Sequence, residues 1–330
     1  MNAFLSPDFT LAAGRVRPSA RVAVLEDGGE IVGFFPFERG RFRIGRPIAT
    51  GVSDCQGVIH APGFRWSTQD LLRGCDLDVW EFDHLLGSQA AWAGQHIAGR
   101  AAPIIDVSRG YELYIAERQR ASKKIVKSTL YKQRKLDRDL GPTRFEFDVQ
   151  DAQALRLLMK WKSAQYRRTG RRDRFAIGWI QRLVMDLFEA RSAGCIGTLS
   201  VLYSDDRVVA AHFGLRSHFT LSCWFPAYDV GLAKYSPGLS LHLRMAEAAP
   251  AAGVRFLELG KGDEEYKESL KTGDVSVGEG WMERPSVIAV ARRVQRSPRR
   301  FAFTFLSRHP RLRTGARNVL KRVGALRGSQ

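Results

Sequence analysis

The sequence predicts a mixed α/β fold of two domains with mostly antiparallel sheets. The chain has 330 residues, more than one average domain holds. Hydrophobic residues make up 44% and charged residues 26%, as in ordinary globular proteins. Some segments alternate apolar and polar residues and are joined by connections of hairpin length. Other, longer segments carry apolar residues at helical spacing. We expect an N-terminal half over 1–120, a C-terminal half over 121–290 and a basic tail over 291–330.

The N-terminal half starts with a hairpin signal. Asp27, Gly28 and Gly29 separate two apolar segments, and Asp-Gly favours a tight turn because both residues tolerate a positive φ. Ser67 precedes a short helical pattern, where its hydroxyl can cap the first turn. The predicted elements are strands over 21–26, 30–39 and 79–82 and a helix over 68–73.

A long charged stretch marks the expected boundary between the halves. Residues 111–140 carry apolar side chains at helical spacing, so we expect one helix there. Gly141 and Pro142 end it, since proline cannot continue a helix. The cations from 118 to 138 are most simply a solvated helix face, and steering of a phosphorylated substrate or tRNA is the alternative.

The C-terminal half is predicted to contain an antiparallel meander. Three apolar segments are joined by connections of hairpin length, and Pro237 and Gly253 delimit the helix that follows. The expected order is strand 143–149, helices 151–168 and 177–193, strands 195–203, 208–215 and 219–228, helix 237–249, strand 255–259, helix 264–271 and strand 276–283.

The first candidate site lies where the third meander strand leads into helix 237–249. Helix N-termini expose unpaired N–H groups that bind phosphates, and glycine lets a ligand approach the backbone closely. A phosphate-binding site is therefore expected, with an ordinary helix start as the alternative. Its residues are Tyr235, Ser236, Gly238 and Ser240.

The second candidate site is the segment Gly260-Lys-Gly-Asp-Glu-Glu-Tyr-Lys at the end of a buried strand. Lys261, between two glycines, can hold a phosphate or stabilise an oxyanion. Asp263 can cap the next helix, and Tyr266 can donate or accept a proton. The alternative is a capped surface helix with solvated charges.

These motifs resemble those of GNAT-superfamily acetyltransferases in the group linked to bacterial cellulose and exopolysaccharide biosynthesis. The matching residues are Asp229 after an aromatic strand, the helix start at 235–238 and the segment 260–267, within a resemblance over about 124–281. The chain is more distantly similar to the Fem-type peptidoglycan aminoacyl transferases. The resemblance implies two tandem GNAT-like (acyl-CoA N-acyltransferase) domains. One departure is that the usual Gln/Arg-x-x-Gly-x-Gly/Ala loop reads Ala-Lys-Tyr-Ser-Pro-Gly over 233–238.

The resemblance implies an acyltransferase that moves an acyl group, in the first instance acetyl, from acyl-CoA to an amine or hydroxyl of a polysaccharide or cell-envelope precursor. No metal is implied. The implied catalytic residues are Lys267, Tyr266 and Asp229; the donor-binding residues are Trp224, Phe225, Tyr235, Ser236, Gly238 and Ser240; the substrate-binding residues are Tyr228, Lys261 and Asp263. The alternatives are Fem-type transfer from aminoacyl-tRNA and a non-catalytic protein that binds membrane or nucleic acid.

The expected mechanism is direct transfer within a cleft between the halves. Backbone N–H groups of 223–225 hold the thioester carbonyl, and Lys267 stabilises negative charge on phosphate or thiolate. Asp229, Glu258 or a water takes the acceptor proton. His212, inside a strand, is interpreted as a structural histidine.

Most of the net charge of +18 lies in the tail. Residues 291–330 hold twelve Lys and Arg, no Asp or Glu, and several Phe and Leu. Such a segment can lie on anionic lipid, and a solvated tail and RNA contact are the alternatives. No secretory signal or membrane-spanning apolar segment is visible, so we expect a cytoplasmic protein, peripheral to the inner membrane if the tail binds lipid. The four widely spaced cysteines predict neither a metal site nor a disulfide framework.

Overall fold

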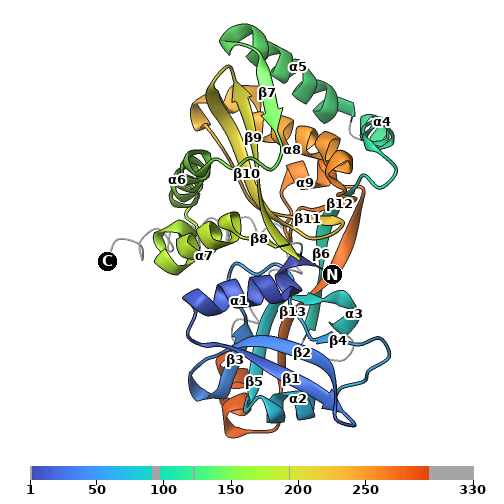
Figure 1. Ribbon diagram of the computed structural model, residues 1–330, viewed down its shortest axis with the longest axis vertical. Coiled ribbons are helices and arrows are strands. Elements are labelled where there is room, and N and C mark those ends of the chain that lie inside the picture. The colour runs from blue at the N-terminus through green and yellow to red at the C-terminus, as the bar shows by residue number, and fades with distance from the viewer. Residues whose placement is uncertain (1, 91–96, 122, 193, 297–330) are drawn as a thin grey trace.

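The computed structural model describes residues 2–90, 97–121, 123–192 and 194–296. Within them, thirteen strands form one sheet that runs through two halves stacked along the long axis (Figure 1). The strand order is β1-β2-β3-β5-β13-β6-β12-β11-β10-β9-β7, with β4 beside β2 and β8 beside β9.

The lower half in Figure 1 comes mainly from the first part of the chain. Its hairpin and the Ser67 cap form as expected, since the Ser67 hydroxyl accepts a hydrogen bond from the Asp70 N–H. Its elements are α1 (Pro7–Val16), β1 (Ala20–Asp27), β2 (Glu30–Arg39), β3 (Ile44–Pro47), β4 (Ile59–His60), α2 (Thr68–Gly74), β5 (Val79–Leu86), α3 (Gly87–Ala90) and β6 (Ile97–Asp106).

The upper half contains the predicted meander. The three strands β9, β10 and β11 pair in sequence order, and helix α8 follows them. The elements are α4 (Tyr111–Ala121), α5 (Lys123–Leu140), β7 (Thr143–Glu146), α6 (Ala152–Arg168), α7 (Gly178–Glu189), β8 (Arg191–Ser192), β9 (Cys195–Ser204), β10 (Arg207–Arg216), β11 (Thr220–Tyr228), α8 (Pro237–Ala248), β12 (Phe256–Glu258) and α9 (Glu265–Leu270). The last strand, β13 (Gly273–Glu283), extends into the lower half beside β5 (Figure 1).

The prediction of one helix over 111–140 is wrong, because the structure has two helices, α4 and α5, in that stretch. The two bury different side chains against different neighbours. Tyr114 of α4 donates a hydrogen bond to the Leu270 carbonyl below it, whereas Val126 and Leu136 of α5 pack in the core beside α8. Helix α1 and strand β6 were not predicted at all.

The sheet is mixed, and its two parallel pairs occupy equivalent places in the two halves. These pairs are β3 with β5 and β11 with β12, while the other strand pairs are antiparallel. Each half ends with one more strand, β6 in the first and β13 in the second. Strand β13 pairs with β5, and β6 pairs with β12, so the halves have exchanged their last strands.

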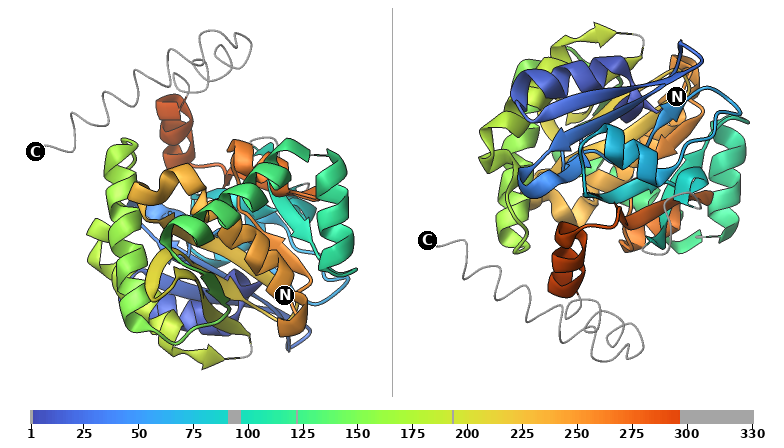
Figure 2. Two further views of the ribbon diagram at one scale, coloured as in Figure 1. Left: turned by 90° about the horizontal axis from the view of Figure 1, so that it is seen from above. Right: turned by 90° about the horizontal axis from the view of Figure 1, so that it is seen from below.

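Helices cover both faces of the upper sheet, as the view from above shows (Figure 2). On one face, α6 and α7 pack on side chains such as Leu199 and Phe213, and on the other α5 and α8 pack on Leu202 and Leu221. Strands buried on both faces explain the nearly continuous apolar sequence of β9 and β10. The site is thus held on a rigid support.

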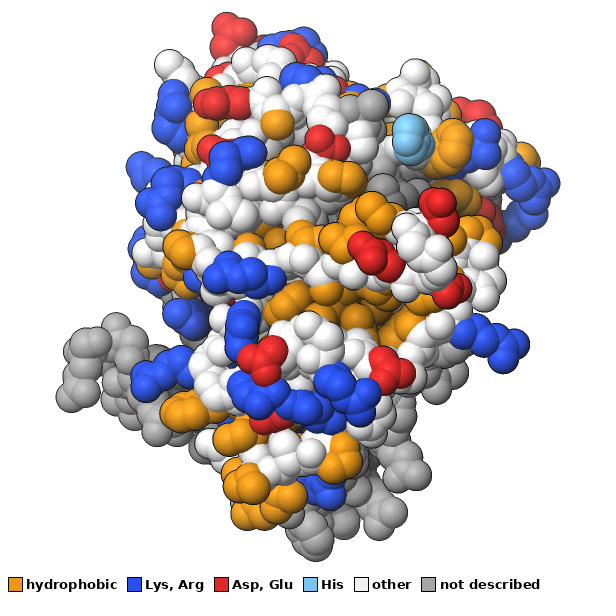
Figure 3. Space-filling view, turned by 60° about the horizontal axis from the view of Figure 1, so that its bottom comes forward, with side chains coloured by type: hydrophobic (Ala, Val, Ile, Leu, Met, Phe, Trp, Pro, Cys, Tyr) orange, Lys and Arg blue, Asp and Glu red, His pale blue; other side chains and the backbone are white. Residues whose placement is uncertain are grey.

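Apolar side chains are exposed on the lower half. Figure 3 shows hydrophobic side chains gathered in a band across the middle of this face. Exposed apolar residues of the hairpin β1–β2 include Val22, Val24, Ile31 and Phe34. Within the described residues, no helix has the length and apolar character needed to cross a membrane.

Candidate functional site

The parallel strands β11 and β12 separate after a short stretch of pairing. Only Thr220, Leu221 and Ser222 have partners on β12, which ends at Glu258, whereas β11 continues to Tyr228. The remaining edge of β11 therefore has backbone N–H and C=O groups without a sheet partner on that side. Such groups need other partners, which makes the opening a natural place for a ligand.

The edge of β11 is bent by a bulge at Trp224. Cys223 pairs with Gly214 and Phe225 with Phe213, so Trp224 is the extra residue. Its indole donates a hydrogen bond of 2.7 Å to the Val52 carbonyl of the first half. The two predicted donor-binding rings are buried in the core, and both residues line the floor of the opening. Bulges of this kind often re-aim strands beside active sites.

Helix α8 begins at the far end of the opening. Ser236 takes the left-handed conformation, with φ 52°, and Pro237 has no N–H to offer a ligand. Gly238 lines the opening against Tyr228, and the Ser236 hydroxyl accepts a hydrogen bond of 2.9 Å from Lys132 of α5. A lysine therefore stands beside this helix N-terminus, where a phosphate would be stabilised.

Two of the predicted donor-binding residues lie behind this helix start. Tyr235 is buried, and its hydroxyl donates to Asp139 at 2.7 Å. Ser240 is buried in α8, and neither residue lines the cavities described below. They support the loop from within the fold.

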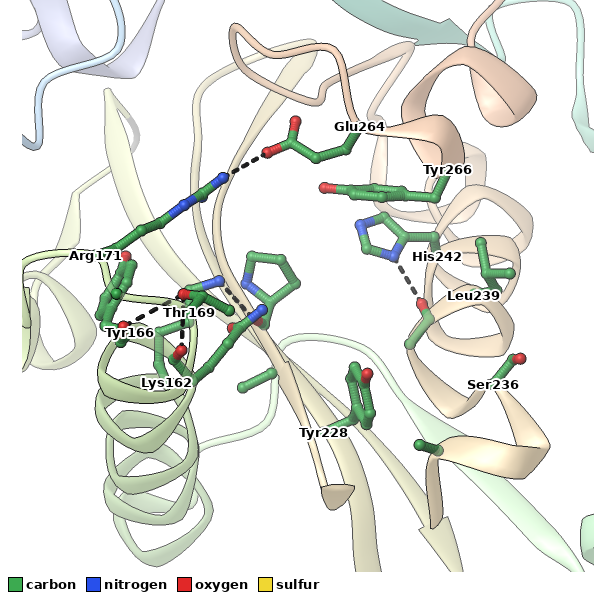
Figure 4. A pocket seen from close by; sticks show the side chains of 16 residues that line it. Lys162, Tyr166, Thr169, Arg171, Tyr228, Ser236, Leu239, His242, Glu264 and Tyr266 are labelled. Carbon is green, nitrogen blue, oxygen red and sulfur yellow. Dashed lines mark hydrogen bonds and ion pairs between the residues drawn. The ribbon is translucent and has the colours of Figure 1, made fainter. Parts of the chain in front are cut away.

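Helix α6 forms the opposite wall and contributes Lys162, which was not predicted. Its ammonium donates a 2.9 Å hydrogen bond to the Pro226 carbonyl on the open edge of β11 (Figure 4). Burial lowers the pKa of Lys162 to about 8, and the nearby Arg171 guanidinium adds to this effect. A lysine with such a pKa can exchange a proton near neutral pH.

His242 of α8 and Tyr266 of α9 face Lys162 across the opening (Figure 4). Their rings lie 5.4 Å apart, and the His242 Nδ1 is 2.7 Å from the Gly238 carbonyl, which requires the proton on Nδ1. Burial lowers the pKa of His242 and raises that of Tyr266. At neutral pH the imidazole is therefore uncharged and the phenol keeps its proton.

Two connected cavities occupy the opening. The outer cleft, about 740 Å³, extends between α6 and the start of α8, and the inner pocket, about 520 Å³, lies between the halves. Both volumes fall in the range of ligand sites. The residues that line both cavities are Lys162, Tyr166, Arg171, Pro226, His242, Glu264 and Tyr266.

Lys267 holds the loop that borders the inner pocket. It is buried, and its ammonium donates to the carbonyls of Gly260 at 3.0 Å and Lys261 at 3.2 Å. It also pairs with Glu264 at 3.2 Å. Three partners in the protein thus engage this ammonium group, so its geometry suits the positioning of the loop.

The remaining predicted residues fall on both sides of the opening. Tyr228 and Tyr266 line the outer cleft, and Lys261 lines the inner pocket while pairing with Glu279. Asp229 lies outside both cavities, where it accepts hydrogen bonds from the Gly231 N–H and from Arg207. Asp263 is exposed, and the N-cap of α9 is Glu264, without a side-chain capping bond.

Two partly buried acids, Glu258 and Asp54, belong to this region, and Asp54 lines the inner pocket. The Glu258 carboxylate accepts hydrogen bonds from Asn2 at 2.7 Å and Ser222 at 2.8 Å, and burial raises its pKa. Burial also raises the pKa of Asp54, while His84 and Arg174 oppose that shift. His212 is fully buried behind His242, and burial lowers its pKa.

The functional residues that sequence reasoning missed come from helices α6 and α8 and from the first half. Lys162 belongs to an amphipathic helix whose many cations gave no reason to single it out. No local motif singled out Arg171, Arg174, His242 or Asp54 either, and only the fold brings these residues together. Within the described residues, no group of His, Cys, Asp or Glu is arranged to hold a metal ion.

Comparisons with known proteins agree with this geometry. Residues 123–268 match the family model of an acetyltransferase (GNAT) domain. No curated protein sequence matches the chain.

Three solved structures share the fold across both halves. The C-terminal domain of a protein described as a lysylphosphatidylglycerol synthetase from Agrobacterium fabrum has a TM-score of 0.55 and 13% identity, covering 82% of this chain and 87% of that one. FemX has a TM-score of 0.55 and 10% identity, covering 83% of this chain and 90% of that one. A protein of unknown function from Bacteroides thetaiotaomicron has a TM-score of 0.53 and 12% identity, covering 84% of this chain and 90% of that one. The chain therefore has a GNAT-like mixed α/β fold, with the GNAT acetyltransferase domain matched over 123–268.

Proposed function

We propose that the chain is an acyltransferase that takes an acyl group, in the first instance acetyl, from acyl-CoA. The separation of β11 from β12 carries this proposal, because it opens a cleft that joins a helix N-terminus to a pocket between the halves. In this proposal the phosphates of the acyl-CoA lie at Gly238 and Lys132, and the thioester of the acyl-CoA lies near the edge of β11. The acceptor, an amine or hydroxyl of a polysaccharide or cell-envelope precursor, enters the inner pocket.

In this proposal Lys162 and Tyr266 transfer the protons, and Lys267 and Asp229 hold the surrounding loops. Neutral Lys162 takes a proton from the acceptor, whose nitrogen or oxygen attacks the thioester carbonyl carbon. The C–S bond breaks as the amide or ester forms, and the Tyr266 hydroxyl donates a proton to the leaving thiolate. Lys267 positions the loop with Lys261, and Asp229 caps the turn that precedes α8.

The donor is tested by thermal unfolding of the full chain with a panel of acyl-CoAs. A ligand at 100 times its Kd stabilises the native state by about 2.7 kcal/mol, which shifts Tm by a few degrees. A saturable shift with one acyl-CoA supports the proposal. The absence of a shift with every acyl-CoA would reject CoA as the donor.

One observation favours the alternative donor, aminoacyl-tRNA. Lys127, Tyr131, Arg134 and Arg138 are exposed on one face of α5, the helix that reaches the start of α8 through Lys132. A basic stripe with an aromatic residue suits a nucleic-acid backbone. Binding of tRNA that weakens log-linearly with salt, and that is lost in a triple variant with Gln at 127, 134 and 138, would favour this donor.

A peripheral membrane contact is proposed for the C-terminal end. Val287, Val290 and Val294 are exposed along one face of the helix over 287–296. The residues 297–330, which hold nine further Lys and Arg and no acid, lie outside the described residues. Sedimentation with vesicles of phosphatidylcholine and phosphatidylglycerol tests this contact. Equal sedimentation with pure phosphatidylcholine vesicles would argue against a charge-dependent contact.

A further inference from the structure

The inner pocket contains charged groups that the proposed chemistry leaves unused. Its wall from the first half carries Asp54, Asp83 and His84, and its wall from the second half carries the turn 171–174 after α6. A pocket charge without a partner in the protein indicates what a ligand can bring. This applies most to Arg174 and Asp54, which are partly buried, because a charge withdrawn from water needs a partner.

The cations of this pocket fall into two groups. Arg171 and Lys267 both pair with Glu264, at 3.5 and 3.2 Å. By contrast, Arg172 and Arg174 have no carboxylate within 4.0 Å among the residues that the structure describes. These two guanidinium groups, two residues apart with Asp173 between them, can therefore hold an anionic group of the ligand, with paired N–H donors suited to carboxylate or phosphate.

The anions of this pocket gather on the opposite wall. His84 lies between two carboxylates, with Nδ1 3.1 Å from Asp83 and Nε2 3.8 Å from Asp54. Asp83 also accepts a 2.7 Å hydrogen bond from Gln56, and these contacts overcome the effect of burial and lower its pKa to about 2. Asp54 has no such direct bond within the described part of the chain, and its carboxylate faces Gly260 at the pocket floor. It is the acid with room for a ligand ammonium.

We propose that the acceptor is a primary amine that also carries an anionic group, held with its ammonium at Asp54 and its anion at Arg172 and Arg174. This inference rests on the proposed acyl transfer and narrows its acceptor to a zwitterion. Lys162 lies between the inner pocket and the outer cleft, so the amine is placed beside the group that accepts its proton.

The reaction balances without a further reactant. The ammonium gives one proton to solvent through Asp54, and the neutral nitrogen forms the bond to the acyl carbon. The C–S bond breaks, and the second proton leaves the nitrogen for Lys162 while the thiolate takes one from Tyr266. The products are an amide that retains the anionic group and free thiol.

The test uses two matched sets of probes and the full chain. One set is β-alanine, propylamine and propionate, and the other is phosphoethanolamine, ethanolamine and ethyl phosphate. Ligand-observed NMR titrations give the Kd of each probe, with acetyl-CoA binding measured on the same protein. We expect the zwitterion of at least one set to bind about tenfold or more tightly than its two relatives, as charge-assisted bonds provide. The set that shows the preference distinguishes carboxylate from phosphate.

Three variants connect the preference to the residues. With Arg172→Gln or Arg174→Gln, the zwitterion should bind no more tightly than the simple amine. With Asp54→Asn, the zwitterion should bind no more tightly than the simple anion. Arg168→Gln is the matched control, because this exposed arginine ends α6 and lines neither cavity. Arg172 is also exposed, so its variant keeps the test valid if the Arg174 or Asp54 variant fails to fold.

Two outcomes would overturn the acceptor class. One is a simple amine that binds as tightly as the zwitterion in both sets, and the other is the absence of binding by all six probes while acetyl-CoA still binds. Zwitterion binding without any acyl-CoA binding would instead reject the CoA donor and leave the acceptor class standing.

Discussion

Lys162 has the properties of a proton acceptor at the level of a single residue. It lies where the two cavities meet, it contacts the open edge of β11, and burial together with Arg171 lowers its pKa to about 8. Below that pH the ammonium has no lone pair to accept a proton, whereas above it the neutral amine does. The protonation state of this one side chain should therefore control the rate.

The first prediction concerns the pH dependence of acyl transfer. We expect kcat/KM to rise with pH through about 8 and then level off. Lys162→Met should abolish this rise and lower kcat/KM about a hundredfold or more, the usual contribution of proton transfer. Lys160→Met, an exposed lysine on the same helix, is the control. A rise through pH 8 that survives in Lys162→Met would assign the titration to another group.

The second prediction separates two roles of Lys267. If this lysine positions the loop, Lys267→Met should lower the free energy of unfolding by about 2 kcal/mol, because the carbonyls of Gly260 and Lys261 lose their donor. Acetyl-CoA binding should change little, because Lys267 lines only the inner pocket. Lys271→Met is the control, since its ion pairs lie at the surface. Unchanged stability with lost turnover would instead show a direct role in the chemistry.

At the level of elements, the start of α8 should decide donor binding. Gly238→Asp puts a negative charge where the donor phosphates are proposed to lie, so it should weaken acetyl-CoA binding about tenfold or more. The same aspartate is favourable in a first helical turn, but its Cβ would lie 3.3 Å from the Tyr228 ring, so the free protein should fold with a slightly lowered Tm. Gly99→Asp, at an exposed glycine of β6, is the control. Tight acetyl-CoA binding by the Gly238 variant, measured by calorimetry, would move the phosphates elsewhere.

Elements set by local sequence signals could be predicted, whereas elements set by contacts between distant segments could not. The meander and α8 were predicted because alternation and end signals are local, and hairpin-length connections leave one pairing. The division between α4 and α5 and the partners of β13 depend on contacts between distant segments. The site shows the same limit: Tyr266 and Gly238 stood in local motifs, whereas Lys162 and Asp54 became candidates only when the fold placed them in one cavity.

For the whole molecule, the exchange of last strands determines how the two halves unfold. Strand β13 lies between β5 and β6, and β6 in turn pairs with β12. Neither half can complete its part of the sheet without a strand from the other. We therefore expect one cooperative transition, in which the candidate site and the lower half lose structure together.

The last prediction tests this coupling by a change in β13. Val277 is buried in that strand, and Val277→Asp places an unpaired charge in the core at a cost of several kcal/mol, a large share of the stability of a typical protein. Hydrogen exchange of amides in β2 and β10 should then accelerate equally, although the two strands lie in different halves. Val275→Asp, at an exposed valine of the same strand, should leave both rates unchanged. If β2 exchanged faster while β10 stayed protected, the halves would be independent folding units, and the cleft between them could open without unfolding either one.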